Sequence, residues 1–177
     1  MKDFYKLYSV GKSTKKPDSR GKSFGYQVLG FGSGVPAGAV AVRGVFGGSF
    51  LGDSSPSNVI DFVEIATLGN ATDFGDISSV SQHGGAGNNN TRAVHALGDV
   101  NDQSVDTLEY VTIASTGNTT DFGDLTVDRS LAPAGLSSAT RTCHGGGYQN
   151  GPGSTNVIDY YTTASAGNAT DFGDLST

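Results

Sequence analysis

Gly69-Asn-Ala-Thr-Asp-Phe-Gly-Asp76 is the stretch that decides the fold of this chain, because it returns as Gly117–Asp124 and as Gly167–Asp174. The copies begin 48 and 50 residues apart. A spacing of this size indicates repeated supersecondary units. Each copy follows a run of β-branched and aromatic residues with a period of two, which is typical of a strand. The sequence therefore predicts an all-β protein.

The repeat reaches further upstream than these eight residues. Arg43, Arg92 and Arg141 each lead into a short apolar run with glycine, and they are 49 residues apart in both intervals. The predicted divisions are an extended basic arm at 1–24, a leading strand segment at 25–42, and three repeats at 43–91, 92–140 and 141–177.

The recurring octapeptide is interpreted as architecture. Its Asn and Gly tolerate left-handed backbone, and its Thr and Asp side chains can bond local amides in a turn. We expect the Phe of each copy to insert between neighbouring repeats. Oxygen ligands at the repeated turns could instead bind calcium, an alternative that stays open beside the expectation of no metal. The residues given structural roles are Asp73, Phe74, Asp76, Asp121, Phe122, Asp124, Asp171, Phe172 and Asp174.

Charge is segregated along the chain. Residues 1–22 hold seven basic and two acidic residues, a net charge of +5, whereas residues 23–177 carry a net charge of −11. A basic arm of this kind is expected to dock on an acidic surface, with a protein lattice favoured over nucleic acid, and a solvated tail is the alternative. The candidate partner-binding residues are Lys2, Phe4, Tyr5, Lys6, Tyr8, Lys12, Lys15, Lys16, Arg20 and Lys22.

Catalytic patterns are weak throughout. Asp73-Phe74-Gly75 spells the magnesium-binding tripeptide of kinases but lacks the accompanying motifs. His95 and His144 occupy equivalent repeat positions, which favours packing over metal binding, and Cys143 is expected in the core. No stretch is apolar enough to cross a membrane. We therefore predict a protein that is not an enzyme, without cofactor, metal or membrane partner.

The order of arginine, strand, glycine pair and strand with Asp and Tyr resembles the kelch repeat over roughly Arg43 to Asp174. That resemblance implies four-stranded, propeller-type blades. The chain has no tryptophan, so Phe74, Phe122 and Phe172 would take the place of the usual blade tryptophan. Because three blades cannot close a ring, we expect a homo-oligomer, unless further repeats follow Thr177.

The wording of the repeat, as in Ile158-Asp-Tyr160 followed by Gly167 to Leu175, resembles a degenerate kelch-like repeat in virion proteins of marine tailed phages, especially cyanophages. The resemblance implies a virion structural protein, a capsid decoration, knob or tail-associated subunit held on other virion proteins by its basic arm. The alternative is a tail-fibre module that binds a receptor or host surface glycan. A groove of exposed aromatics, Tyr148, Tyr160 and Tyr161, would favour it.

Overall fold

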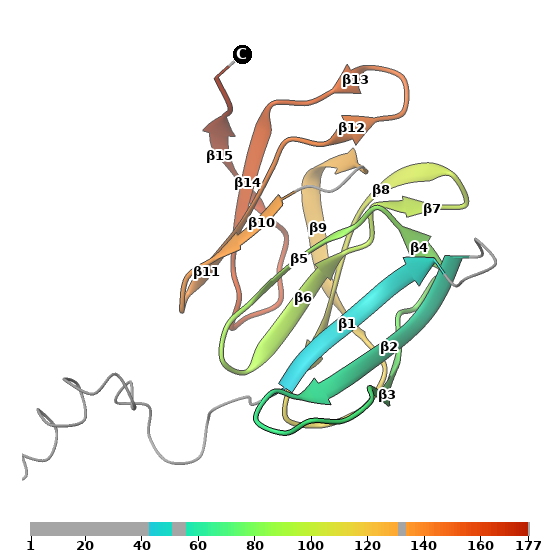
Figure 1. The fold of residues 1–177 in the computed structure, drawn as a ribbon. Coiled ribbons are helices and arrows are strands. Elements are labelled where there is room, and N and C mark those ends of the chain that lie inside the picture. The colour runs from blue at the N-terminus through green and yellow to red at the C-terminus, as the bar shows by residue number, and fades with distance from the viewer. Residues whose placement is uncertain (1–42, 51–55, 131–133, 177) are drawn as a thin grey trace, which may run out of the picture. The chain divides into compact units, whose positions relative to one another are not determined.

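The computed structural model describes residues 43–50, 56–130 and 134–176, and over these residues the protein is all-β, with fifteen strands and no helix (Figure 1). The described residues accordingly contain no helix that could span a membrane. The arm at 1–24 and the leading segment at 25–42 lie outside them.

The described residues form three antiparallel sheets that follow one another along the chain, and a separate two-stranded hairpin. The first sheet has the order β1 (Arg43–Phe50), β2 (Pro56–Glu64) and β3 (Thr72–Asp76). The second sheet has the order β5 (Gly85–Asn88), β6 (Arg92–Ala96), β8 (Gln103–Thr112) and β9 (Thr120–Arg129), extended by β7 (Asp99–Val100) and β4 (Ser81–Gln82). The third sheet has the order β10 (Ala134–Ser137), β11 (Arg141–Gly145), β14 (Val157–Thr162) and β15 (Thr170–Asp174), and the separate hairpin consists of β12 (Tyr148–Gln149) and β13 (Gly153–Ser154).

The sheets are out of phase with the sequence repeats. β4 and β5 precede Arg92 in the chain but pair with β7 and β6, and β10 precedes Arg141 but pairs with β11. The end of one repeat therefore belongs to the sheet of the next repeat. Strand pairing therefore joins consecutive sequence repeats, because each sheet contains strands of two repeats.

The recurring octapeptide is a turn only over its first residues, because the Thr-Asp-Phe-Gly-Asp part of each copy is a strand. Each of these strands contains a β-bulge at its Phe. Opposite β2, Gly75 pairs with Ile60 and Asp73 pairs with Asp61, so Phe74 is the extra residue. The register of the other two copies shifts in the same way, which leaves Phe122 and Phe172 as extra residues.

The arginine that opens each repeat stacks on the aromatic residue of the long strand. The Arg43 guanidinium lies 4.5 Å from the centre of the Phe62 ring, and Phe62 meets Phe74 edge to face at 5.9 Å. Such cation–π and edge-to-face contacts are favourable. The other two stacks are Arg92, Tyr110 and Phe122, and Arg141, Tyr160 and Phe172. The repeat spacing therefore preserves a three-member stack in each sheet.

Within the described part of the chain, two apolar clusters form the core, and each lies between consecutive sheets. The cluster between the first and second sheets contains Ile60, Phe74, Ile77, Leu97 and Val111. The cluster between the second and third sheets contains Val94, Ala96, Leu108, Phe122, Leu125 and Tyr161. The core of this protein is thus made at the junctions of its repeats.

Candidate functional site

The turn of the second octapeptide binds the edge strand of the first sheet. The main-chain N–H of Gly117 donates to the carbonyl oxygen of Phe74 over 2.7 Å. The N–H of Thr119 donates to the carbonyl oxygen of Asp76 over 2.9 Å. Between these bonds, the side-chain oxygen of Asn118 accepts from the N–H of Asp76 over 3.1 Å. The three bonds occupy the edge of β3, whose main-chain groups would otherwise be open to pairing.

The third octapeptide repeats this arrangement on the second sheet. The N–H of Gly167 donates to the carbonyl oxygen of Phe122 over 2.6 Å, and the N–H of Ala169 donates to that of Asp124 over 2.7 Å. The side-chain oxygen of Asn168 accepts from the N–H of Asp124 over 3.2 Å. We call each set of three bonds a turn lock. The two turn locks use equivalent atoms, so they are a property of the repeat.

Each turn lock requires glycine in the strand that it covers. Gly75 and Gly123 have φ angles of +149° and +139°. A Cβ atom on Gly75 would lie 2.4 Å from the carbonyl oxygen of Gly117, and one on Gly123 would lie 2.6 Å from the carbonyl carbon of Gly167. The backbone approach therefore excludes any side chain at these two positions.

The Phe of the bulge fills the space beneath the turn lock. Phe74 and Phe122 are both 2% exposed. Phe74 belongs to the same cluster as Val111 of the next sheet, and the Phe122 ring lies 4.9 Å from that of Tyr161 in the third sheet. Phe172 differs, because it is 58% exposed and contacts Tyr160 of its own sheet. The expected insertion between repeats thus holds for two Phe residues and is wrong for the third.

A carboxylate at the middle of the long strand makes a second contact between sheets. Glu109 accepts from the N–H of Ser78 over 3.1 Å and also from its hydroxyl. Asp159 accepts from the N–H of Thr126 over 3.2 Å and from its hydroxyl over 2.5 Å. Both carboxylates are buried, so these bonds satisfy acceptors that water cannot reach.

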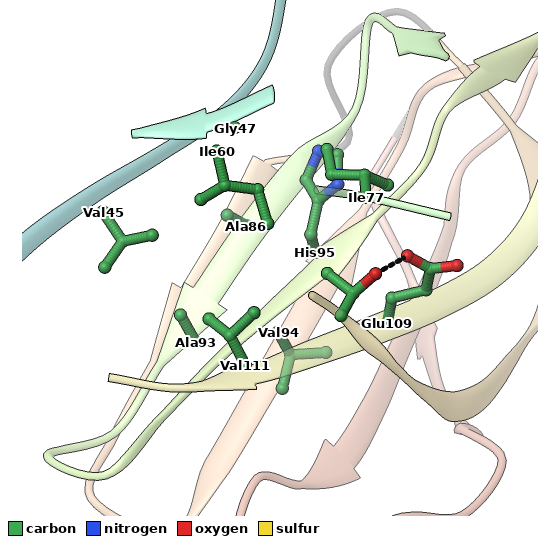
Figure 2. Close-up of a pocket in the computed structure, with 11 residues that line it drawn as sticks. Val45, Gly47, Ile60, Ile77, Ala86, Ala93, Val94, His95, Glu109 and Val111 are labelled. Carbon is green, nitrogen blue, oxygen red and sulfur yellow. Dashed lines mark hydrogen bonds between the residues drawn. The ribbon is translucent and has the colours of Figure 1, made fainter. Parts of the chain in front are cut away.

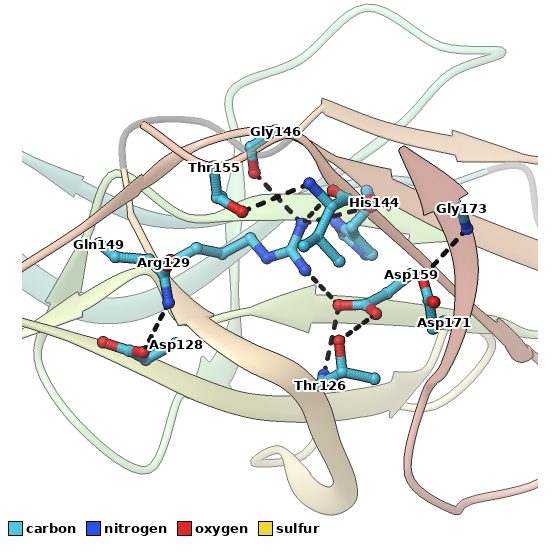
Figure 3. A network of polar contacts seen from close by, with 11 residues as sticks. Thr126, Asp128, Arg129, His144, Gly146, Gln149, Thr155, Asp159, Asp171 and Gly173 are labelled. Atoms are coloured by element: carbon cyan, nitrogen blue, oxygen red, sulfur yellow. Dashed lines mark hydrogen bonds and ion pairs between the residues drawn. The ribbon is translucent and has the colours of Figure 1, made fainter. Parts of the chain in front are cut away.

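The second junction adds a buried ion pair between Arg129 and Asp159, whose side chains are fully buried (Figure 3). Arg129 also donates to the carbonyl oxygens of Val157 over 3.0 Å and Gly146 over 3.2 Å. Burial lowers the pKa of Arg129, and the neighbouring Asp159 charge acts in the opposite direction. A guanidinium stays protonated in proteins, so the pair is ionic.

His144 and Tyr161 continue this network at the second junction. The Nε2 atom of His144 lies 3.0 Å from the hydroxyl of Tyr161, and both residues are buried. Burial raises the pKa of the Tyr161 phenol, which keeps it neutral. The pair therefore serves packing and hydrogen bonding, as the equivalent positions of His95 and His144 in the repeat predicted.

The first junction contains a partly open cavity of about 70 Å³, lined by His95, Glu109, Thr119 and apolar side chains of both sheets (Figure 2). Burial lowers the pKa of His95, and Glu109 partly opposes this effect. The Nδ1 atom of His95 has no hydrogen-bond partner within the described residues. Ligand pockets are usually about 300–1,000 Å³, so this space is too small for a substrate. Glu109 is also already bonded by Ser78 and Thr119.

The repeated aspartates do not converge on a metal site. Asp73, Asp121 and Asp171 are exposed on three different strands. Asp171 accepts from the N–H of Gly173 over 3.0 Å within its own strand. Among residues 43–50, 56–130 and 134–176, no three His, Cys, Asp or Glu side chains lie close enough to hold a metal ion. Asp76 and Asp124 act through their main-chain groups in the turn locks, and Asp174 takes part in no turn lock with the residues that the structure describes.

The three tyrosines predicted for a glycan groove do not line one. Tyr161 is buried between sheets, and Tyr160 stacks between Arg141 and Phe172. Only Tyr148 of the three is exposed. Cys143, expected in the core, lies half-buried on β11. Tyr160 and Tyr161, predicted in exposed loops, therefore lie on a strand, and Cys143, predicted in the core, is only half-buried.

The proposed anchor residues of the arm fall outside the part of the chain that the structure describes. They are Lys2, Phe4, Tyr5, Lys6, Tyr8, Lys12, Lys15, Lys16, Arg20 and Lys22.

Sequence reasoning assigned the turn side chains to local hydrogen bonds and missed that Asn118 and Asn168 bind the preceding sheet. It also missed the carboxylate contacts of Glu109 and Asp159. The signal was present, because an Asn and an acidic residue recur at these positions in every repeat. Their partners lie 31 to 44 residues away, and a single sequence does not identify such pairs.

A comparison with protein-family models finds no match to this chain, and a comparison with curated protein sequences finds none either.

Proposed function

We propose that this chain is a structural protein of a tailed-phage virion, a capsid decoration, knob or tail-associated subunit. In this proposal the sheets are kelch-like, propeller-type blades, and residues 1–24 attach the protein to other virion proteins. The repeat body presents a stable scaffold outward from the particle.

The observation that carries this proposal is the use made of the shared repeat residues. The Asn118 and Asn168 amides, the Phe74 and Phe122 rings and the Glu109 carboxylate all bind a neighbouring sheet. The polar groups among them, the two amides and the carboxylate, form hydrogen bonds that hold neighbouring repeats together. Such a molecule is suited to assembly and mechanical support, and the sequence resemblance to phage virion repeats points the same way.

Segregated charge supports the attachment role of the arm. The arm is basic and the remainder of the chain has a net charge of −11. Opposite charges on two parts of one protein favour docking of the basic part on an acidic partner and repulsion of the acidic part from it. The orientation that follows places the arm inward and the sheets outward.

The test is incorporation into particles. Tailed-phage particles are assembled with the full chain, with a chain lacking residues 1–24, or with a full chain whose seven arm Lys and Arg residues are Gln. Quantitative mass spectrometry of gradient-purified particles then measures copy number. We expect fixed occupancy for the full chain and at least a tenfold loss for both variants. A full chain absent from particles would overturn the virion role, and normal occupancy of the truncated chain would overturn the anchor.

A further inference from the structure

The two faces of each sheet have different partners. We define the back face as the side that carries the repeat Phe, and the front face as the side that carries the long-strand acidic residue, Asp61, Glu109 or Asp159. At both junctions the back face of one sheet packs on the front face of the next. Two faces have no such neighbour within the described residues: the front of the first sheet and the back of the third.

Both of these faces are apolar and open. Seven of the nine large apolar side chains that are exposed in the described part of the chain lie on or beside them. On or beside the front of the first sheet these are Phe46, Val59, Ile65 and Leu68, and on the back of the third sheet they are Leu136, Phe172 and Leu175. Single exposed apolar residues are ordinary, but a concentration at two faces indicates contact surfaces.

Counterparts within the chain show what these side chains do when covered. Leu175 is 45% exposed, whereas Ile77 and Leu125 at the same repeat position are 2% and 5% exposed. On the other face, Ile65 is 69% exposed and its counterpart Ile113 is 5% exposed. The same positions are therefore buried wherever a neighbouring sheet exists.

The polar parts of the junction are also present and unused at the two ends. Among the described residues, the turn Gly69-Asn70-Ala71 is exposed and makes no turn lock, and the strand β15 receives none. A Cβ atom on Gly173 would meet no atom of these residues within 4 Å, although its φ of +137° matches that of Gly123. The third sheet thus keeps the backbone shape that accepts a turn lock.

The acceptor and the donor of the carboxylate contact are also present at the two ends, one at each. Asp61 occupies the position of Glu109 and Asp159, and Ser176 occupies the position of their partners Ser78 and Thr126. A carboxylate and a hydroxyl are the groups that form this contact at both internal junctions. Every component of the junction is accordingly found once more, divided between the two ends of the described chain.

We propose that two copies of this chain associate head to tail, with the front of the first sheet of one copy on the back of the third sheet of the other. In this contact Asn70 of one copy accepts from the N–H of Asp174 of the other, and Asp61 accepts from Ser176. Gly69 does not have the +155° φ of Gly117 and Gly167, so its backbone rotates on docking, which glycine permits. The occupant is a second copy because the chain itself carries both complementary surfaces.

A head-to-tail contact is heterologous, because it joins two different surfaces. Two copies related in this way contribute six sheets, a number within the four to eight blades of closed propellers. The inference goes beyond the virion proposal, since it concerns this chain alone and requires no phage partner.

Three matched substitutions test it, each placing Asp at an exposed aliphatic residue. Ile65→Asp alters the front face, Leu175→Asp alters the back face, and Val80→Asp, at a residue 46% exposed between β3 and β4, lies on neither. Sedimentation of the 177-residue chain should give a species of at least twice 18.1 kDa for the unchanged protein and for Val80→Asp. Ile65→Asp and Leu175→Asp alone should each sediment as monomers.

The most decisive experiment mixes the two variants Ile65→Asp and Leu175→Asp. Ile65→Asp retains an intact back face and Leu175→Asp retains an intact front face, so an equimolar mixture should form dimers. A mixture that stays monomeric would overturn the head-to-tail contact. So would an unchanged protein that is monomeric at 100 μM, or a Val80→Asp variant that dissociates as the face variants do. Circular dichroism of each monomer establishes that the variants remain folded.

Discussion

The two junctions between sheets have the same main-chain contacts, but different side chains fill the space between the sheets. Each has a turn lock, a bulged Phe and a buried carboxylate. Between the first two sheets the remaining volume is apolar and leaves a cavity beside His95. Between the last two sheets it is filled by the Arg129–Asp159 pair and by His144 with Tyr161. The difference teaches that main-chain bonds define the junction, while the side chains that fill it are free to change.

The largest expected difference between the junctions concerns their carboxylates. Asp159→Ala leaves Arg129 buried without its ionic partner, and we expect a loss of about 3–5 kcal/mol in the free energy of unfolding. Glu109→Ala leaves only hydroxyl and amide donors, with an expected loss of about 1–3 kcal/mol. Urea unfolding of both variants measures the contrast. Equal losses would show that the ion pair adds nothing to the second junction.

The close approach of the turn lock can be separated from backbone strain. Gly123→Ala and Gly173→Ala meet similar φ angles, +139° and +137°, but only the first introduces an atom against another backbone. Strain at such a φ costs about 1–3 kcal/mol in either variant. We expect Gly123→Ala to lose at least about 2 kcal/mol more than Gly173→Ala, the range of overpacking. The comparison is made in the Leu175→Asp background, where β15 is uncovered.

The His95 cavity should make the first junction sensitive to pH. The pKa of His95 is lowered by burial, so below about pH 6.5 the unfolded chain binds a proton that the folded chain does not. Stability is therefore lost as pH falls from 7.5 to 5.5, by at most about 1.4 kcal/mol per unit below 6.5. Phe46 occupies the equivalent position in the first repeat. The substitution His95→Phe therefore introduces a residue type that the repeat already contains, and it removes this part of the pH dependence of stability. Parallel pH profiles for the two proteins would contradict the assignment.

The Asn bond is the smallest contribution and should be alike at both junctions. Asn118→Ala and Asn168→Ala each remove one acceptor, with an expected loss of about 0.5–1.5 kcal/mol. Asn70→Ala is the matched control, because its turn is exposed in the single chain. Thermal unfolding of the three variants in the Leu175→Asp background should show two equal shifts and one unchanged midpoint. A shift for Asn70→Ala as large as the others would refute the inter-sheet role.

Local patterns in the sequence predicted the all-β class and the positions of the long strands. Alternation predicted the long strands, although they end at Glu64, Thr112 and Thr162, before the alanine that follows in each repeat. The bulge at Phe74 was not foreseen, because its register depends on pairing between strands. The exposure of Phe172 was not foreseen either, since a repeat position predicts burial only where a neighbouring sheet exists. Non-local partners decide both features.

Amide hydrogen exchange at the three turns tests the central claim, that the octapeptide is a lock between sheets, most directly. In the Leu175→Asp monomer, the N–H groups of Gly117, Thr119, Gly167 and Ala169 donate to the preceding sheet, and those of Gly69 and Ala71 have no such acceptor within the described residues. We predict slow exchange for the first four amides and fast exchange for the last two. Equal exchange in all three turns would show that the bonds are local to each turn, and would contradict the account.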